Sequence, residues 1–137
     1  MDMSGRTREA GFTLRRLISM ARDAPGGSRE EQQNYSDAFA ILAGLGRPDI
    51  IIRLSSGKTD GVKLAAVNAI GWMEGASRGD SARAAEALGM DALALHSFVR
   101  AGLYDDAERI ARAGGDERRL LEISSLRRLD SAKHANR

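Results

Sequence analysis

Apolar residues recur along this chain at the i, i+3, i+4, i+7 spacing that places side chains on one face of an α-helix. Five segments carry the pattern, and each would present an apolar stripe that a neighbouring helix can cover. The sequence therefore predicts an all-α fold, a compact bundle of about six to eight short helices. The five stripes are Leu14/Leu17/Ile18/Ala21, Tyr35/Ala38/Phe39/Leu42, Val62/Ala65/Ala66/Ala69, Leu95/Phe98/Val99/Gly102 and Ala107/Ile110/Ala111/Gly114.

Residues that favour helix ends divide the chain into these elements. Pro25-Gly26-Gly27 would end the first helix, and Ser28 with Glu31 has the S-x-x-E spacing of a capping box. In the second half most segments begin at Asp or Ser and end at Gly, as capped helices do. The predicted helices span residues 7–24, 28–45, 50–54, 61–75, 81–88, 91–101, 105–113 and 116–129.

The segment 50–54 could form a helix or a strand, because the β-branched residues Ile50-Ile51-Ile52 favour a strand by propensity. We interpret it as a short helix, since a lone strand would have no partner for its backbone hydrogen bonds. The segment 61–75 is apolar on most of its circumference, which is typical of a central helix. We therefore expect Trp72 and Met73 in the core and Asn68 buried with a hydrogen-bond partner.

The domain organisation follows from the same pattern. We expect a single all-helical domain over residues 1–129, of a size that can bury a core without cross-links. Residues 130–137 lack apolar content, so a disordered tail is predicted there.

The composition and charge of the chain limit its possible cellular compartment and partners. The chain has no cysteine, which fits the cytoplasm or another reducing compartment. Its apolar runs are far shorter than the roughly 20 residues that span a bilayer. The net charge is only +2, so nucleic acid is not favoured as a partner by the overall field.

Catalytic chemistry has little support, and we expect no enzyme activity, no cofactor and no metal. His96 and His134 lack a second histidine at ligand spacing. Adjacent acidic residues such as Asp105 and Asp106 point about 100° apart on a helix, so they cannot face each other as a catalytic dyad. Gly57-Lys58-Thr59 resembles the end of a phosphate-binding loop, but Ile52 stands where that loop needs its first glycine.

The segment from Arg100 to Ala111 places Gly102, Tyr104 and Ala107 at turn and contact positions. It resembles a hairpin turn of a tetratricopeptide-like protein or a related α-solenoid, and helical-hairpin character extends over about half the chain. The resemblance implies a protein-binding scaffold. A faint internal repeat accompanies it, in which Ala82, Ala85, Asp91, Leu95 and Phe98 return as Ala107, Ile110, Asp116, Leu120 and Ile123.

Residues 81–104 also resemble a bacterial helix-turn-helix. Gly89 would lie in the turn, with Leu95 and Phe98 on the inner face of the second helix. The resemblance implies that outward residues of the second helix read DNA. These would be His96, Ser97 and Arg100 together with Asp91, Ala92 and Ala94, and Asp91 would meet phosphate unfavourably.

The sequence thus predicts a non-enzymatic protein–protein interaction or assembly protein that uses grooves between helical hairpins. Adaptor, chaperone and structural component belong to this class, and the expected partner is a protein, foremost a second copy of the chain. The alternative is a helix-turn-helix regulator that binds DNA. Candidate contact residues for a protein partner are Trp72, Met73, Phe98, Tyr104, Arg118, Arg119, Arg127 and Arg128.

Overall fold

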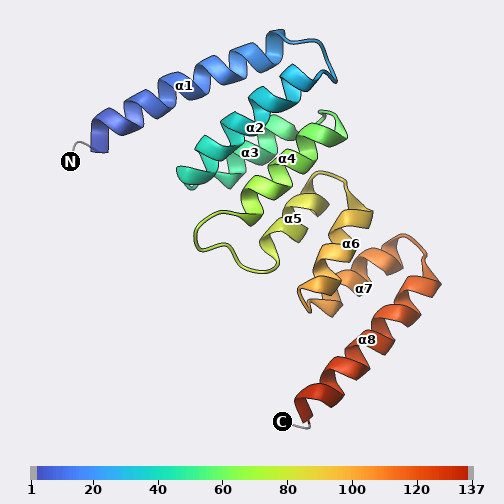
Figure 1. Cartoon of the computed structure of the whole chain (residues 1–137). Coiled ribbons are helices and arrows are strands. Elements are labelled where there is room, and N and C mark those ends of the chain that lie inside the picture. The colour runs from blue at the N-terminus through green and yellow to red at the C-terminus, as the bar shows by residue number, and fades with distance from the viewer. Residues whose placement is uncertain (1–2, 136–137) are drawn as a thin grey trace. The chain divides into compact units, whose positions relative to one another are not determined.

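A computed structural model describes the backbone of residues 3–135 and the side chains of residues 11–134. Over this range the chain forms eight α-helices and no strand, as predicted (Figure 1). Residues 50–54 lie in a helix, which confirms that interpretation. The helices are α1 (Met3–Asp23), α2 (Arg29–Gly44), α3 (Pro48–Ser55), α4 (Asp60–Gly71), α5 (Asp80–Ala87), α6 (Asp91–Arg100), α7 (Tyr104–Ala113) and α8 (Glu117–Ala135).

Contacts among the helices divide the chain into two compact units, an N-terminal unit Met1–Ser77 and a C-terminal unit Arg78–Arg137. The single domain expected over residues 1–129 stays a prediction.

The segment predicted to be a disordered tail is helical as far as it is described. Helix α8 continues through Ala135, and residues 136–137 lie outside the described range. Extending a helix that has already formed adds a hydrogen bond for each residue fixed and needs no new nucleus, so apolar content is not required. His134 also lies 3.6 Å from the Asp130 carboxylate, one turn earlier.

Helix α2 is central to the N-terminal unit, because it packs against α1, α3 and α4. Its predicted stripe is buried in full, and the rings of Tyr35 and Phe39 stack with centroids 5.8 Å apart. The remaining buried apolar residues of this unit are Ala21, Ile51, Val62, Ala66, Val67 and Ile70.

The predicted capping box starts α2. The Ser28 hydroxyl accepts a hydrogen bond from the Glu31 N–H at 3.1 Å. The Glu31 carboxylate accepts one from the Gly27 N–H at 3.1 Å, while the Ser28 N–H donates to the Pro25 carbonyl. Free amides at the helix start are satisfied, which fixes where α2 begins after the Gly-Gly turn.

Helix α4 differs from the expectation of a helix buried all round. Val62, Ala66, Val67 and Ile70 are buried, but Asn68 is exposed and Trp72 is 89% exposed. The prediction of Trp72 in the core was wrong, as was that of a buried Asn68. Helix α4 packs against α2 and α3, and Leu64 and Asn68 are its exposed side chains near Trp72.

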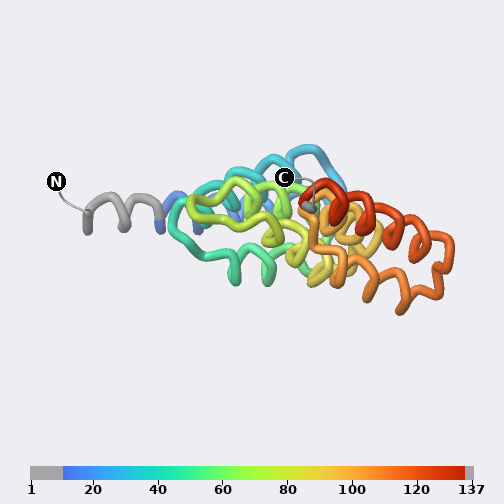
Figure 2. The backbone as a smooth tube through the Cα atoms, turned by 90° about the horizontal axis from the view of Figure 1, so that it is seen from below, coloured from blue at the N-terminus to red at the C-terminus, as the bar shows by residue number. Residues whose placement is uncertain are grey.

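In the C-terminal unit each helix packs against the next, from α5 to α8 (Figure 2). The turns that join these helices share one conformation. Gly89, Gly102 and Gly115 have φ of 76°, 75° and 67°, and they recur every 13 residues. In the second turn the Gly102 N–H donates to the Val99 carbonyl at 3.0 Å and the Leu103 N–H donates to the Phe98 carbonyl at 2.9 Å. The other two turns repeat this pair of bonds, which closes the helix C-terminus.

This regular turn gives the unit the character of a helical repeat, with one helix and one turn every 13 residues. The sequence repeat had related Ala82 to Ala107, an offset of 25, one short of two such steps. The buried apolar residues of the unit are Ala82, Ala84, Ala85, Leu88, Ala94, Leu95, Phe98, Ala107, Ala111 and Ile123.

The turn between α7 and α8 offers a matched test, because Gly114 and Gly115 are adjacent. Gly115→Ala should destabilise the C-terminal unit by roughly 1–2 kcal/mol, since its left-handed φ places a Cβ against the backbone. Gly114 has φ of −84°, and a Cβ there would lie 3.6 Å from the Ile110 carbonyl oxygen, an ordinary contact. Gly114→Ala is therefore expected to be neutral or slightly stabilising in denaturant titrations. Equal losses from both replacements would contradict the turn.

Candidate functional site

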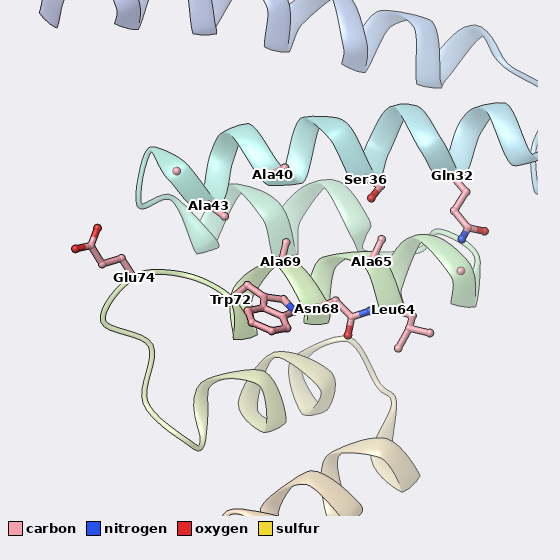
Figure 3. Close-up of a pocket in the computed structure, with 12 residues that line it drawn as sticks. Gln32, Ser36, Ala40, Ala43, Leu64, Ala65, Asn68, Ala69, Trp72 and Glu74 are labelled. Carbon is pink, nitrogen blue, oxygen red and sulfur yellow. The ribbon is translucent and has the colours of Figure 1, made fainter.

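A groove of about 560 Å³ lies between α2 and α4 in the N-terminal unit (Figure 3). Ser36 and Ala40 project from α2 toward Ala65 and Ala69 on α4. The lining residues are Gln32, Ser36, Ala40, Ala43 and Gly44 from α2, Gly61, Leu64, Ala65, Asn68 and Ala69 from α4, and Trp72 and Glu74 beyond α4.

Small side chains create the hollow. Ala40 and Ala43 on α2, with Ala65 and Ala69 on α4, offer little volume to fill the space above the buried contact. At one end Gln32 lies over Gly61, where an added Cβ would collide with the Gln32 amide. The Gln32 side chain therefore occupies the space over Gly61 at that end, and methyl groups form the floor of the groove further along.

Trp72, the residue that ends α4, lies at the other end of the groove. Its backbone N–H is held by the Asn68 carbonyl at 3.2 Å, while the side chain remains exposed. Leu64, one of the other lining residues, is 44% exposed. A large aromatic side chain outside the core is the residue type that most often anchors a protein interface.

The groove is weakly acidic. Among its described lining residues Glu74 is the one ionisable side chain, and there is no Lys or Arg. Gln32, Ser36 and Asn68 add neutral hydrogen-bonding groups. A phosphate or nucleotide would find no positive partner here, whereas a helix with apolar side chains and a basic group would be compatible.

The Gly57-Lys58-Thr59 segment has structural roles in the N-terminal unit. The Thr59 hydroxyl accepts a hydrogen bond from the Val62 N–H at 3.5 Å and caps α4. The Lys58 ammonium lies 5.7 Å from the centre of the Tyr35 ring, a cation–π contact. This segment therefore orients α4 against α2.

The candidate contact residues named from the sequence do not form one site. Trp72 lines the groove, and Met73 follows it as a half-buried residue. Phe98 is fully buried in the core of the C-terminal unit, so it was wrong as a contact residue. Tyr104 is half-buried at the start of α7, where it lines a shallow hollow together with Arg127.

The arginines of α8 also differ among themselves. Arg118, Arg119 and Arg128 are exposed. Arg127 forms ion pairs with the carboxylates of Asp105 and Glu108 on α7, the second at 3.4 Å. Arg127 thus contributes to holding α8 against α7, a role that the sequence did not indicate.

Residues 81–104 form two helices joined at Gly89, with Leu95 and Phe98 buried as the helix-turn-helix resemblance implied. Among the residues expected to face outward, His96 and Arg100 are exposed and Ser97 is half-buried, but Ala94 is buried, contrary to expectation. Helix α6 packs against both α5 and α7.

An ion pair joins α5 to α7, the two helices against which α6 packs. Arg109 donates two hydrogen bonds to the Glu86 carboxylate, one of them at 2.8 Å from Nη2 to Oε1. These bonds lower the pKa of Glu86 and raise that of Arg109. The positive charge of Arg109 is therefore paired within the fold rather than offered to a phosphate backbone.

Several candidate residues become visible only in the structure. In the groove these are Gln32 and Ser36 on α2, Leu64 on α4 and Glu74 beyond α4, so no local pattern could join them. On α8 the exposed leucines are Leu121, Leu126 and Leu129. The eight-residue spacing of Leu121 and Leu129 places both on one helix face and was a sequence signal for that surface.

Comparisons with protein-family models, with curated proteins and with solved structures found no match for this chain. Within the described range, no helix is both long and apolar enough to cross a membrane. No group of three or more His, Asp or Glu side chains in that range could hold a metal ion.

Proposed function

We propose that this chain is a non-enzymatic protein–protein interaction protein, and that its α2–α4 groove binds a helix of a partner protein. The observation that carries the proposal is the exposed Trp72 side chain at the end of a groove floored by alanine. Burying that ring would stabilise a complex, because large aromatic side chains contribute most to binding free energy at interfaces.

The shape and charge of the groove favour a helix as the occupant. Two helices form its walls, and a third can lie along such a groove with side chains at i, i+3, i+4 and i+7 against it. The small residues Ala40 and Ala69 would let that helix approach closely. Glu74 would favour a Lys or Arg on the partner near the end at which Trp72 lies.

The repeat-like helices support the same function class. The turn at Gly102 belongs to the segment that resembles a tetratricopeptide-type hairpin, which implies a protein-binding scaffold. The DNA-binding alternative is less well supported, because Arg109 is paired with Glu86 and the start of α6 carries Asp91. A titration with duplex DNA at several salt concentrations tests it, since phosphate contacts give affinity that falls steeply with salt.

Trp72 also provides the probe for the groove, because it is the only tryptophan of the chain. Partners from an extract of the native host would be identified with the wild-type chain and then purified. On titration, Trp72 emission should shift to shorter wavelength as the ring leaves water. Trp72→Ala should weaken binding, measured by calorimetry, by about 30-fold or more, corresponding to roughly 2 kcal/mol.

Leu45→Ala is the matched control, because Leu45 is exposed near the same end of α2 but does not line the groove. It should bind the purified partner as the wild type does. Unchanged affinity of Trp72→Ala, or an emission spectrum that does not move on binding, would overturn the proposed site.

A further inference from the structure

Helix α8 has two distinct sides. The inner side packs on α7, where Ile123 is 1% exposed and Arg127 forms its ion pairs. The opposite side is exposed and carries two leucines, Leu121 at 69% and Leu129 at 66% exposure. We call this side the outer face of α8, and its central residues are Arg118, Leu121, Glu122, Ser125, Arg128, Leu129 and Ala132.

The outer face is complementary to itself about Ser125. When two antiparallel helices are related by a two-fold axis, residues at equal distances before and after the central position meet across the interface. About Ser125 this rule pairs Leu121 with Leu129 and Glu122 with Arg128.

We infer that the outer face of α8 binds the outer face of α8 in a second copy of the chain, antiparallel and centred on Ser125. Each of these two pairs occurs twice in such a dimer. Four leucines then become buried at the centre, and the flanking pairs bring opposite charges together. The pairing does not depend on the proposed groove, which lies in the N-terminal unit.

Charge complementarity favours an antiparallel second copy over a parallel one. In a parallel pair each residue meets its own equivalent, which places Glu122 beside Glu122 and Arg128 beside Arg128. Like charges across an interface oppose binding. Within one chain, Glu122 lies 3.6 Å from Arg118, and Arg128 donates from Nε to the Ser124 carbonyl at 3.4 Å. That bond leaves the terminal Nη groups of Arg128 for a carboxylate of the second copy.

A charge exchange tests the register. We expect wild-type chain to form a dimer at micromolar concentration in analytical ultracentrifugation. Glu122→Arg and Arg128→Glu should each weaken dimerisation about tenfold or more, because each places two like-charge contacts in the dimer. The double variant Glu122→Arg/Arg128→Glu should dimerise as the wild type does, and an equimolar mixture of the two single variants should form a mixed dimer.

Arg119→Glu is the matched control, since Arg119 is an exposed arginine of α8 outside the outer face. It should leave dimerisation unchanged, and circular dichroism should show the same helix content in all variants. The inference is overturned by a wild-type monomer across this range, by single variants that still dimerise, or by an exchange that does not restore dimerisation.

Cross-linking gives a second measurement that does not depend on charge. The chain has no cysteine, so Ser125→Cys would introduce a lone thiol at the axis. Oxidation should give a disulfide-linked dimer rapidly. Ser131→Cys, exposed on α8 but away from the outer face, should cross-link much more slowly. Equal rates for the two variants would contradict the antiparallel pairing about Ser125.

Discussion

Phe98→Ala is expected to destabilise the C-terminal unit by about 3–5 kcal/mol, the usual cost of removing a buried aromatic ring. Phe98 is fully buried on α6, which packs against both α5 and α7. A unit of this length is stabilised by only roughly 3–9 kcal/mol, so the loss would bring it close to unfolding. Denaturant titration followed by far-ultraviolet circular dichroism measures the effect.

Trp72→Ala serves as the comparison, because the larger ring is removed from an exposed position. Its free energy of unfolding should change by less than about 1 kcal/mol. Composition alone suggests the reverse order, since tryptophan has the larger apolar surface. A loss above about 3 kcal/mol for Trp72→Ala, or a small one for Phe98→Ala, would contradict the burial of these two residues.

Periodicity predicted the fold class because apolar residues that recur at helical spacing form stripes that neighbouring helices cover. The stripe of α2, with Tyr35 and Phe39, is buried as predicted, and the Ser28 cap lies where the S-x-x-E spacing placed it. Such features are local, because residues within one or two turns determine them. The helix at 50–54 also followed from a simple requirement, since a strand there would have lacked a partner.

Periodicity could not identify the open side of α4. A helix that is apolar all round gives no preferred direction, and only the positions of α2 and α3 determine that Val62 is buried while Leu64 is exposed. The groove depends on this choice, because it forms where the exposed side of α4 adjoins α2. The same reason explains why Trp72 was assigned to the core.

The sequence revealed the C-terminal repeat only in part. The turns recur at a regular interval, but the side chains between them do not recur with the same residue types. The left-handed glycines Gly89, Gly102 and Gly115 return every 13 residues. The side chains between them vary from Phe98 to Ala111 at equivalent buried positions. A comparison by residue type therefore finds an approximate period, whereas the backbone bonds of the turn show the regular one.

Helix α8 provides the second large expected effect, because a single residue contributes most of its buried surface. Ile123 is its one fully buried apolar residue among the described side chains, and α8 packs chiefly against α7. Ile123→Asp should cost about 3 kcal/mol or more, since it removes that packing and places a charge against α7. We expect α8 to undock, so its amides should lose protection in hydrogen exchange while those of α5 and α6 keep theirs.

Leu121→Asp makes the same replacement two residues earlier on the same helix. Leu121 is exposed, so protection of α8 should remain and stability should change by no more than about 0.5 kcal/mol. Dimerisation should nevertheless be lost, because Leu121 would face Leu129 of the second copy. The two variants thus separate docking of α8 within the chain from pairing between chains. Retained protection in Ile123→Asp would contradict the inner contact, and retained dimerisation in Leu121→Asp would contradict the outer one.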